Sequence, residues 1–225
     1  MSFDSVSVVV PAYNEEKCLG STLQSLRNQI QPISELIVVD NNSVDATVEV
    51  AEKFADKVLT EKNQGEAYAR QRGVEEASSR FIVSCDSDTI YPWDHVQKIV
   101  ETLNQEGVAG VHGYLDVGDK AFNAVYHYFV LLNRLWGFPQ VGASNMAFKK
   151  KYFQGFKIRY PHSFDILLSK HLMKQGELIY RPDLKVRVSN RRLEENIFQA
   201  VKDHSKNYFG LLLLGKPMMT MTDIR

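Results

Sequence analysis

Short apolar runs alternate with helically spaced apolar residues along the first half of the chain. The first run, 6–10, is apolar except for Ser7 and does not alternate, as in a central parallel strand that is buried on both faces. Strands are expected at 6–10, 35–39, 57–60 and 80–84, and helices at 15–27, 44–55 and 66–77. This alternation predicts an α/β fold, an open, doubly wound, mostly parallel sheet with helices on both faces.

The second half of the chain is less regular. Strands are expected at 108–117, 144–149, 178–180 and 184–188, and helices at 121–136, 163–174 and 193–214. No internal repeat, low-complexity segment or linker divides the chain, and 225 residues are enough for one sizeable core. We therefore expect a single domain over residues 1–225.

Composition narrows the class of protein. Hydrophobic residues make up 44% and charged residues 24%, which is typical of a soluble globular protein. Lys plus Arg equals Asp plus Glu at 27 each, and this neutrality argues against a nucleic-acid partner. Cys18 and Cys85 form no metal-ligand pattern and indicate a reducing compartment.

The apolar segments are too short to cross a bilayer, which takes about 20 apolar residues. The chain starts without a basic region followed by a long apolar one, so we expect no signal peptide and a cytoplasmic location. The segment 208–214 has two readings. It is a buried helix face, which we prefer, or an interfacial segment that makes a peripheral contact with the inner face of the membrane.

Polar residues follow several of the predicted strands. Tyr13, Asp40 and the segment 86–88 all come just past a strand end. Ligands of open α/β sheets bind beyond the carboxyl ends of the strands, so these side chains mark the edge where a nucleotide would lie. Neither a Gly-x-Gly-x-x-Gly nor a Gly-Lys-Ser/Thr motif is present, so metal and side chains would have to hold any phosphate.

Asp86, Ser87 and Asp88 place two carboxylates on alternate positions after a strand. Mg²⁺ commonly takes one or two carboxylates together with substrate phosphates, so a metal here would neutralise a leaving nucleotide. Taken alone, the pattern is more often a solvated strand-end turn. Asp40 has two readings as well: its segment supplies caps for the helix that follows, or its carboxylate bonds a base or ribose.

Five segments resemble successive blocks of the family 2 glycosyltransferases, in family order and over nearly the whole chain. They read Val-Val-Val-Pro-Ala-Tyr-Asn-Glu-Glu (8–16), Ile-Val-Val-Asp-Asn-Asn-Ser-Val-Asp-Ala-Thr (37–47), Ala-Arg-Gln-Arg-Gly (69–73), Cys-Asp-Ser-Asp (85–88) and Gly-Ala-Ser-Asn-Met-Ala-Phe (142–148). The resemblance implies a GT-A fold, with a nucleotide-binding half at 1–115 and an acceptor half at 116–225 that ends in a helical segment.

The resemblance also implies a role for each matching residue. The nucleotide-binding set would be Pro11, Ala12, Tyr13, Glu15, Asp40, Arg70, Asp86 and Ser87. Within it, Tyr13 would lie against the base, Arg70 would contact base or diphosphate, and Asp86 would face the ribose. Asp88, of the DxD motif, would ligate Mg²⁺ or Mn²⁺. The loop beneath the transferred sugar and acceptor would be Gly142, Ala143, Ser144 and Asn145.

Inversion in this family needs a carboxylate that deprotonates the acceptor. The family usually has Glu-Asp at the start of a helix, with a Gly eleven residues after the Asp. Here the pair reads Phe164-Asp165, and Gly176 lies at that distance. Asp165 is therefore the expected general base, the alternative being a carboxylate that stabilises a helix N-terminus.

The chain departs from the family pattern at one of the residues that usually bind the metal. Many relatives place a His after a late strand, whereas this chain has no His at 185–192. Arg191 and Arg192 would supply positive charge to the diphosphate there, the alternative being a surface basic pair.

The resemblance thus implies an inverting, metal-assisted glycosyltransferase of the hexosyltransferase type, in cell-surface glycan biosynthesis. Its donor would be a UDP- or GDP-linked sugar, and its acceptor a hydroxyl of a glycan or lipid-linked sugar. Two alternatives stay open: a sugar-1-phosphate nucleotidyltransferase and a non-catalytic nucleotide-sugar-binding module. A nucleotidyltransferase would need a Gly-rich, basic loop after the first strand. The segment Pro-Ala-Tyr-Asn-Glu-Glu at 11–16 is neither Gly-rich nor basic.

Overall fold

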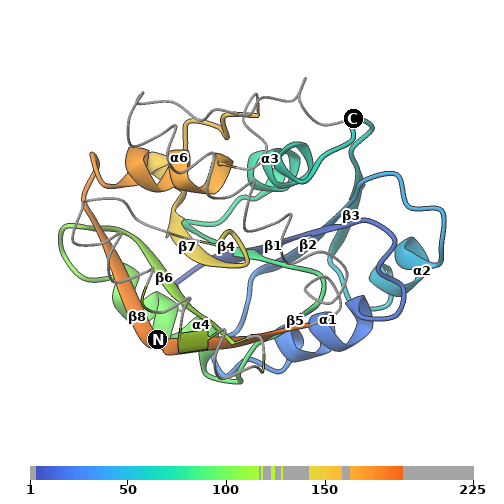
Figure 1. The fold of residues 1–225 in the computed structure, drawn as a ribbon, viewed down its shortest axis with the longest axis horizontal. Helices are drawn as coiled ribbons and strands as arrows, with labels where there is room; N and C mark the ends of the chain where they lie inside the picture. The colour runs from blue at the N-terminus through green and yellow to red at the C-terminus, as the bar shows by residue number, and fades with distance from the viewer. Residues whose placement is uncertain are drawn as a thin grey trace.

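The computed structural model describes residues 4–116, 118, 123–124, 128, 142–158 and 163–189. Their strands form one eight-stranded sheet in the order β3-β2-β1-β4-β7-β6-β8-β5 (Figure 1). The strands are β1 (Val6–Ala12), β2 (Glu35–Asp40), β3 (Lys57–Thr60), β4 (Phe81–Cys85), β5 (Thr89–Ile90), β6 (Val108–Asp116), β7 (Asn145–Lys149) and β8 (Glu177–Val188). The helices are α1 (Leu19–Arg27), α2 (Thr47–Ala51), α3 (Glu66–Glu76), α4 (His95–Leu103) and α6 (Phe164–Leu172), with the 3-10 helix η1 (Lys150–Tyr152).

Parallel pairing brings the carboxyl ends of three strands to one edge of the sheet. β1 pairs in parallel with β2 and β4, and β2 with β3. In this register Ala12 lies opposite Asp40, and Val9 lies opposite Ser84. β7 runs antiparallel to β4 and β6, while β8 is parallel to β6. The loops after β1, β2 and β4 therefore meet at the same edge, where ligands of such sheets bind.

Helices cover both faces of the sheet. α1 and α4 pack on one face, and α3 and α6 pack on the other (Figure 1). Gly73 lets α3 approach the sheet closely, because a Cβ at this position would lie 2.4 Å from Val9 Cγ1. The doubly wound, mostly parallel α/β architecture predicted from the hydrophobic pattern is confirmed.

Some predicted boundaries were wrong. The expected strands at 178–180 and 184–188 form one strand, β8, because a register shift against Gly113 and Tyr114 of β6 accommodates Pro182. The first helix starts at Leu19 rather than at 15, since the residues before it form a turn in which Cys18 and Leu19 donate to the Glu15 carbonyl. The second helix covers only Thr47–Ala51 of the expected 44–55.

The strand β5, the helix α4 and the short 3-10 helix η1 were not predicted. β5 has only two residues, which is too short for a recognisable pattern. α4 does carry a helical pattern, because Val96, Ile99, Val100 and Leu103 are buried on one side of it. The same spacing can be recognised in the sequence, so α4 could have been predicted.

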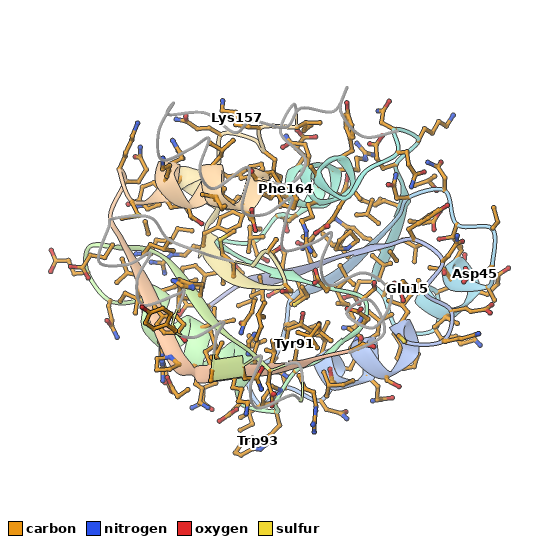
Figure 2. The ribbon with its side chains drawn as sticks, viewed as in Figure 1. Glu15, Asp45, Tyr91, Trp93, Lys157 and Phe164 are labelled. Atoms are coloured by element: carbon orange, nitrogen blue, oxygen red, sulfur yellow. The ribbon has the colours of Figure 1, made fainter. Side chains whose placement is uncertain are left out.

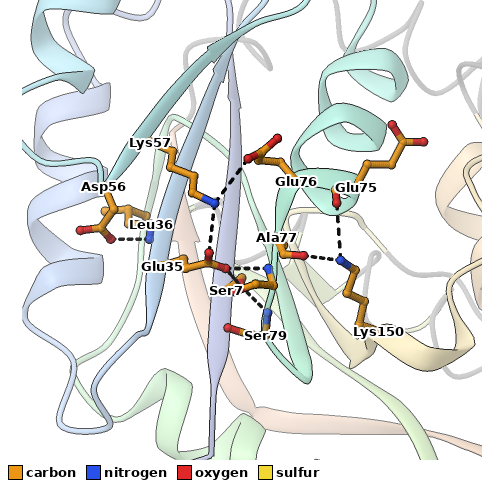
Figure 3. Close-up of polar contacts among 11 residues, drawn as sticks. Ser7, Glu35, Leu36, Asp56, Lys57, Glu75, Glu76, Ala77, Ser79 and Lys150 are labelled. Carbon is orange, nitrogen blue, oxygen red and sulfur yellow. Dashed lines mark hydrogen bonds and ion pairs between the residues drawn. The ribbon is translucent and has the colours of Figure 1, made fainter.

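Glu35 joins the other ends of three strands (Figure 3). Its carboxylate accepts hydrogen bonds from the Ser7 hydroxyl, from the Ser78 N–H at 2.8 Å and from Lys57 Nζ at 3.2 Å. Although burial acts to raise it, these hydrogen bonds lower the pKa of Glu35 to about 2. The network aligns the starts of β1, β2 and β3, away from the edge where their carboxyl ends meet.

Several expectations fall on residues outside the described ranges. The helix expected at 121–136 falls mostly outside them, and the helix expected at 193–214 falls wholly outside, with the apolar segment 208–214. Within the described ranges, no helix has the length and apolar character needed to cross a membrane.

Candidate functional site

A cavity of about 540 Å³ opens at the carboxyl edge of the sheet. Its wall comes from the loops after β1 and β2, the start of α3 and the end of β4. The lining residues are Pro11, Ala12, Tyr13, Asn14, Glu15, Asn41, Gln64, Gly65, Glu66, Ala69, Asp86 and Ser87. These described lining residues include the acidic Glu15, Glu66 and Asp86 but no Lys, Arg or His. The cavity therefore suits a neutral ligand with hydrogen-bond donors better than it suits an anion.

Hydrogen bonds tie the loop after β1 to the loop after β2. The Asn14 N–H donates to Ser43 Oγ at 2.9 Å, and the buried Glu15 N–H donates to Thr47 Oγ1 at 2.7 Å. Tyr13 lies in the first loop and is 49% exposed at the cavity wall. These hydrogen bonds hold the loop that carries Tyr13 in place, and its exposed ring is open to an aromatic ligand.

Asn41 fixes the turn that leads into α3. Its Nδ2 donates to the carbonyl oxygens of Glu61 and Asn63, both at 2.8 Å. Its Oδ1 accepts from the Gly65 N–H at 2.7 Å. Gly65 has a φ of 138°, which residues with a side chain rarely adopt. Asn41 and Gly65 together therefore set where α3 begins and where Glu66 enters the cavity.

Arg70 lies beneath the cavity with no exposed surface. Its Nε donates to Glu66 Oε1 at 2.8 Å, and its Nη2 donates to Asp86 Oδ1. Its Nη1 donates to Ser84 Oγ at 2.6 Å, to the Cys85 carbonyl at 2.9 Å and to the Ala143 carbonyl at 3.4 Å. One buried guanidinium therefore ties together the start of α3, the end of β4 and the loop before β7.

Tyr91, which is labelled in Figure 2, makes a second connection between the end of β4 and the loop before β7. Its hydroxyl accepts from the Asp86 N–H at 2.9 Å and donates to the Ser144 carbonyl at 2.8 Å. Its ring lies 5.1 Å from that of His95, and both side chains are buried. The segment that begins at Asp86 and the loop that contains Ser144 are thus held together through one hydroxyl group.

A second cavity of about 380 Å³ lies beside Asp88. The residues around it are Lys17, Cys18, Ser21, Thr22, Asp88, Ile90, Gly118, Arg187, Val188 and Ser189. Lys17 and Arg187 are exposed cations, whereas Asp88 is the one carboxylate among these described lining residues. The Ser87 carbonyl accepts from Thr22 Oγ1 at 2.9 Å, so the 86–88 segment separates the two cavities. This cavity, unlike the first, suits an anion together with a cation bound at Asp88.

Asp165 is the second residue of α6, next to α3 on the same face of the sheet (Figure 1). Burial raises the pKa of Asp165 to about 7, although the Ile166 N–H, at 2.8 Å from Oδ1, acts to lower it. The charges of Glu66 and Arg70 also act on this carboxyl group. Asp165 lines neither cavity, but a carboxyl group that titrates near neutral pH is suited to proton transfer.

The structure places the nucleotide-binding candidates in two groups. Those that line the first cavity are Pro11, Ala12, Tyr13, Glu15, Asp86 and Ser87. Arg70 is not at the surface, and its N–H donors are occupied by protein groups. It therefore contacts the protein where a contact with base or diphosphate was expected. Asp40 is 5% exposed and accepts from the Ser43 N–H at 3.3 Å, while its neighbour Asn41 lines the cavity instead.

The loop expected beneath the sugar offers few side chains. Gly142 is partly exposed, whereas Ala143, Ser144 and Asn145 are buried. Asn145 Nδ2 donates to the Tyr114 carbonyl at 3.1 Å and to the Leu184 carbonyl at 2.8 Å, joining β6 to β8. Its side chain thus has a structural contact where a ligand contact was expected.

Arg191 and Arg192 lie outside the described residues. Other residues line the cavities without having been singled out in the sequence: Asn14, Asn41, Gln64, Gly65, Glu66, Ala69, Lys17 and Arg187. The signal available for Glu66 was a glycine directly before a predicted helix. Arg187 gave no signal, because its place beside Asp88 follows from the pairing of β8 with β5.

Comparison with known proteins agrees with this geometry. The family model described as glycosyl transferase family 2 matches residues 7–168. A putative glycosyltransferase of Bacillus subtilis, EpsH, is 35% identical over 111 residues, which is 47% of this chain and 32% of the relative. The matches to the first curated relatives cover between 32% and 48% of their lengths.

Two solved structures share the fold. The mannosyltransferase PcManGT from Pyrobaculum calidifontis, in complex with GDP-Man and Mn²⁺, superposes with a TM-score of 0.74 at 20% identity, covering 91% of this chain and 61% of that one. The glucosyl-3-phosphoglycerate synthase of Mycobacterium tuberculosis, in complex with Mn²⁺, UDP-glucose and phosphoglyceric acid, gives a TM-score of 0.73 at 24% identity, covering 95% and 81%.

Proposed function

The chain belongs to glycosyl transferase family 2, and from this membership we propose that it transfers a sugar from a nucleoside diphosphate donor to an acceptor hydroxyl, with inversion. One observation carries the proposal. Two cavities of different charge lie on either side of the 86–88 segment, at the carboxyl edge of the sheet. A nucleoside diphosphate has the matching form, since its nucleoside is neutral and its diphosphate is anionic.

The nucleoside would occupy the first cavity. The base would stack on the exposed ring of Tyr13, and Asp86 would accept a hydrogen bond from the ribose. Arg70 would act from below by holding the Asp86 carboxylate in place. In this arrangement residues 1–115 supply the nucleoside site, and residues 116–225 supply the acceptor side and, through Arg187, a contact to the diphosphate.

The diphosphate would occupy the second cavity. Lys17 and Arg187 are cations that reach it from the turn before α1 and from β8, and each suits a phosphate oxygen. The same phosphates would lie next to Asp88. This assignment gives Arg187 the role that the sequence suggested for Arg191 and Arg192.

Asp88 fits a hard divalent cation such as Mg²⁺ or Mn²⁺. Such ions take oxygen ligands and are commonly bound by one or two carboxylates together with substrate phosphates and water. In the described part of the chain, no cluster of three His, Cys, Asp or Glu side chains surrounds Asp88. The remaining ligands would therefore come from the donor and from water, and the bound ion would offset charge developing on the leaving diphosphate.

Asp165 would act as the general base. Its carboxylate would take the proton of the acceptor hydroxyl, whose oxygen bonds to the anomeric carbon as the bond to the diphosphate breaks. The products are the glycosylated acceptor and a nucleoside diphosphate. The acceptor would be a hydroxyl of a glycan or a lipid-linked sugar that enters beside Phe164, where the family usually has Glu.

The test is thermal stabilisation by UDP and by GDP, each with and without Mn²⁺. Ligand binding to the folded state raises its melting temperature. We expect one nucleotide to stabilise the protein in the presence of the metal, and Asp88→Ala to abolish this effect. Asp183→Ala is the matched control, because Asp183 is exposed on β8 and lines neither cavity.

Absence of a shift with either nucleotide at millimolar concentration would contradict the proposal. Turnover separates the alternatives. Release of a nucleoside diphosphate from a sugar donor is expected here, whereas release of pyrophosphate from a nucleoside triphosphate would identify a nucleotidyltransferase. Metal-dependent binding without any turnover would identify a binding module.

A further inference from the structure

Glu66 is a carboxylate in the first cavity to which neither the hydrophobic pattern nor the family resemblance assigns a role. It is the first residue of α3, and its side chain is 49% exposed at the cavity wall. The preceding turn is fixed, because Asn41 Oδ1 accepts from the Gly65 N–H at 2.7 Å. Glu66 therefore enters the cavity from a rigid element.

Glu66 and Asp86 come from different elements and meet at one guanidinium group. Nε of Arg70 donates to Glu66 Oε1 at 2.8 Å, and Nη2, which also lies 2.8 Å from Glu66 Oε1, donates to Asp86 Oδ1. Since both carboxylates contact the same guanidinium, they lie side by side on the cavity wall. Asp86 alone balances the charge of the buried guanidinium, so a second carboxylate is not required to neutralise Arg70.

The simplest structural role for Glu66 is an ion pair with Arg70 at positions i and i+4 of a helix. Such pairs contribute little when one partner is exposed, as Glu66 is. An ion pair alone does not explain why the carboxylate lines the cavity beside Asp86. The second oxygen of each carboxylate can accept only, so together they suit a ligand with two adjacent hydroxyl donors.

From this juxtaposition we infer that Glu66 is a specificity residue, whose carboxylate accepts a hydrogen bond from one ribose hydroxyl while Asp86 accepts from the other. The inference rests on the proposed placement of the nucleoside in this cavity. The site would then recognise the ribose diol, so ribonucleotides are bound in preference to deoxyribonucleotides. The base and the diphosphate do not compete for this position, since Tyr13 offers the base its ring and Lys17 and Arg187 lie at the second cavity.

The experiment measures dissociation constants by calorimetry in the presence of Mn²⁺. The ligands are UDP and GDP, and the 2′-deoxy and 3′-deoxy analogues of whichever binds more tightly. We expect the wild-type protein to bind the ribonucleotide about tenfold more tightly than at least one deoxy analogue, which is the typical effect of one hydrogen bond to a charged group.

Glu66→Gln replaces one acceptor oxygen by a donor, and Glu66→Asp keeps the charge but shortens the reach. Both should reduce the preference over that analogue to about twofold or less, mainly by weakening ribonucleotide binding. Glu49→Gln is the matched control, because Glu49 is also acidic and in the first turn of a helix but lines neither cavity. It should keep the full preference.

An unchanged preference in both Glu66 variants, or an equal loss of affinity for all analogues, would overturn the inference while leaving the proposed function standing. Failure of the wild-type protein to bind either ribonucleotide would instead overturn the proposed function, and this inference with it.

Discussion

Arg70 and Asp86 form an ion pair in which the cation is completely buried and the carboxylate lies at the cavity wall. The guanidinium reaches Asp86 from α3, below the end of β4. Asp86 is therefore placed by a residue that no ligand in the cavity can touch directly. The arrangement gives Arg70 a positioning role, which its place in the sequence block 69–73 does not reveal.

Removal of Arg70 should be strongly destabilising. Arg70→Ala leaves two carboxylates without their cation and several buried acceptors without a donor, and we expect a loss of about 3–5 kcal/mol in the free energy of unfolding. Urea denaturation measures this change. Arg72→Ala is the matched control, since Arg72 is exposed on the same helix and should change stability by less than about 0.5 kcal/mol. Equal losses in the two variants would contradict the role of Arg70.

Tyr91→Phe removes only the hydroxyl group that bridges the Asp86 N–H and the Ser144 carbonyl. Both groups would be left without this partner, so we expect a loss of about 1–3 kcal/mol in stability. Turnover should fall more than nucleotide affinity does, because the relative placement of two parts of the site is disturbed. Tyr152→Phe serves as the control, on a residue that lines neither cavity. A Tyr91→Phe protein as stable and active as wild type would exclude the bridge as a functional contact.

The pH dependence of turnover tests Asp165. Because burial raises its pKa to about 7, the carboxylate needed for proton removal forms as pH rises through 7, and activity should rise with it. Asp165→Asn should reduce turnover by at least about 100-fold at pH 8 and leave nucleotide affinity nearly unchanged. An activity profile that is flat between pH 6 and 8 would argue against this base.

The same residue should also affect stability. A carboxyl group with a raised pKa in the folded protein holds its proton more tightly there, so it destabilises the fold as pH rises from 3.8 through about 7. Asp165→Asn should therefore raise the melting temperature at pH 8 and have little effect on it at pH 4. Differential scanning fluorimetry at the two values distinguishes this effect from a general change in packing.

His95 should limit stability in acid. Its ring is buried, neither ring nitrogen has a hydrogen-bond partner within the described structure, and burial lowers its pKa from 6.5 to about 3. The unfolded chain takes up a proton below pH 6.5 that the folded protein rejects, so stability falls as pH drops from 6.5 toward 3. His95→Leu should lose less stability over this range. Parallel curves of unfolding free energy against pH for the two proteins would show that His95 does not limit stability in acid.

Much of the fold could be predicted from the sequence because its strands are buried on both faces. The mainly apolar runs at β1, β2 and β4 have few alternatives, and each ends at a polar residue or just before one. The strand β3 was predicted with its observed bounds. By contrast, β5 has two residues and β8 passes over Pro182 through a register shift, so both depend on their partner strands.

The sequence by itself determined the class of fold, the edge of the sheet where the site lies and half of the residues that line the first cavity. These follow from local chemistry, since a polar residue after a buried strand must lie at its end. Tertiary structure decided the rest. Arg70 lies beneath the cavity because α3 crosses over β1, Arg187 lies beside Asp88 because β8 pairs with β5, and Glu66 meets Asp86 on one guanidinium group. Each of these contacts joins residues through strand order and helix packing, which no local pattern in the sequence specifies.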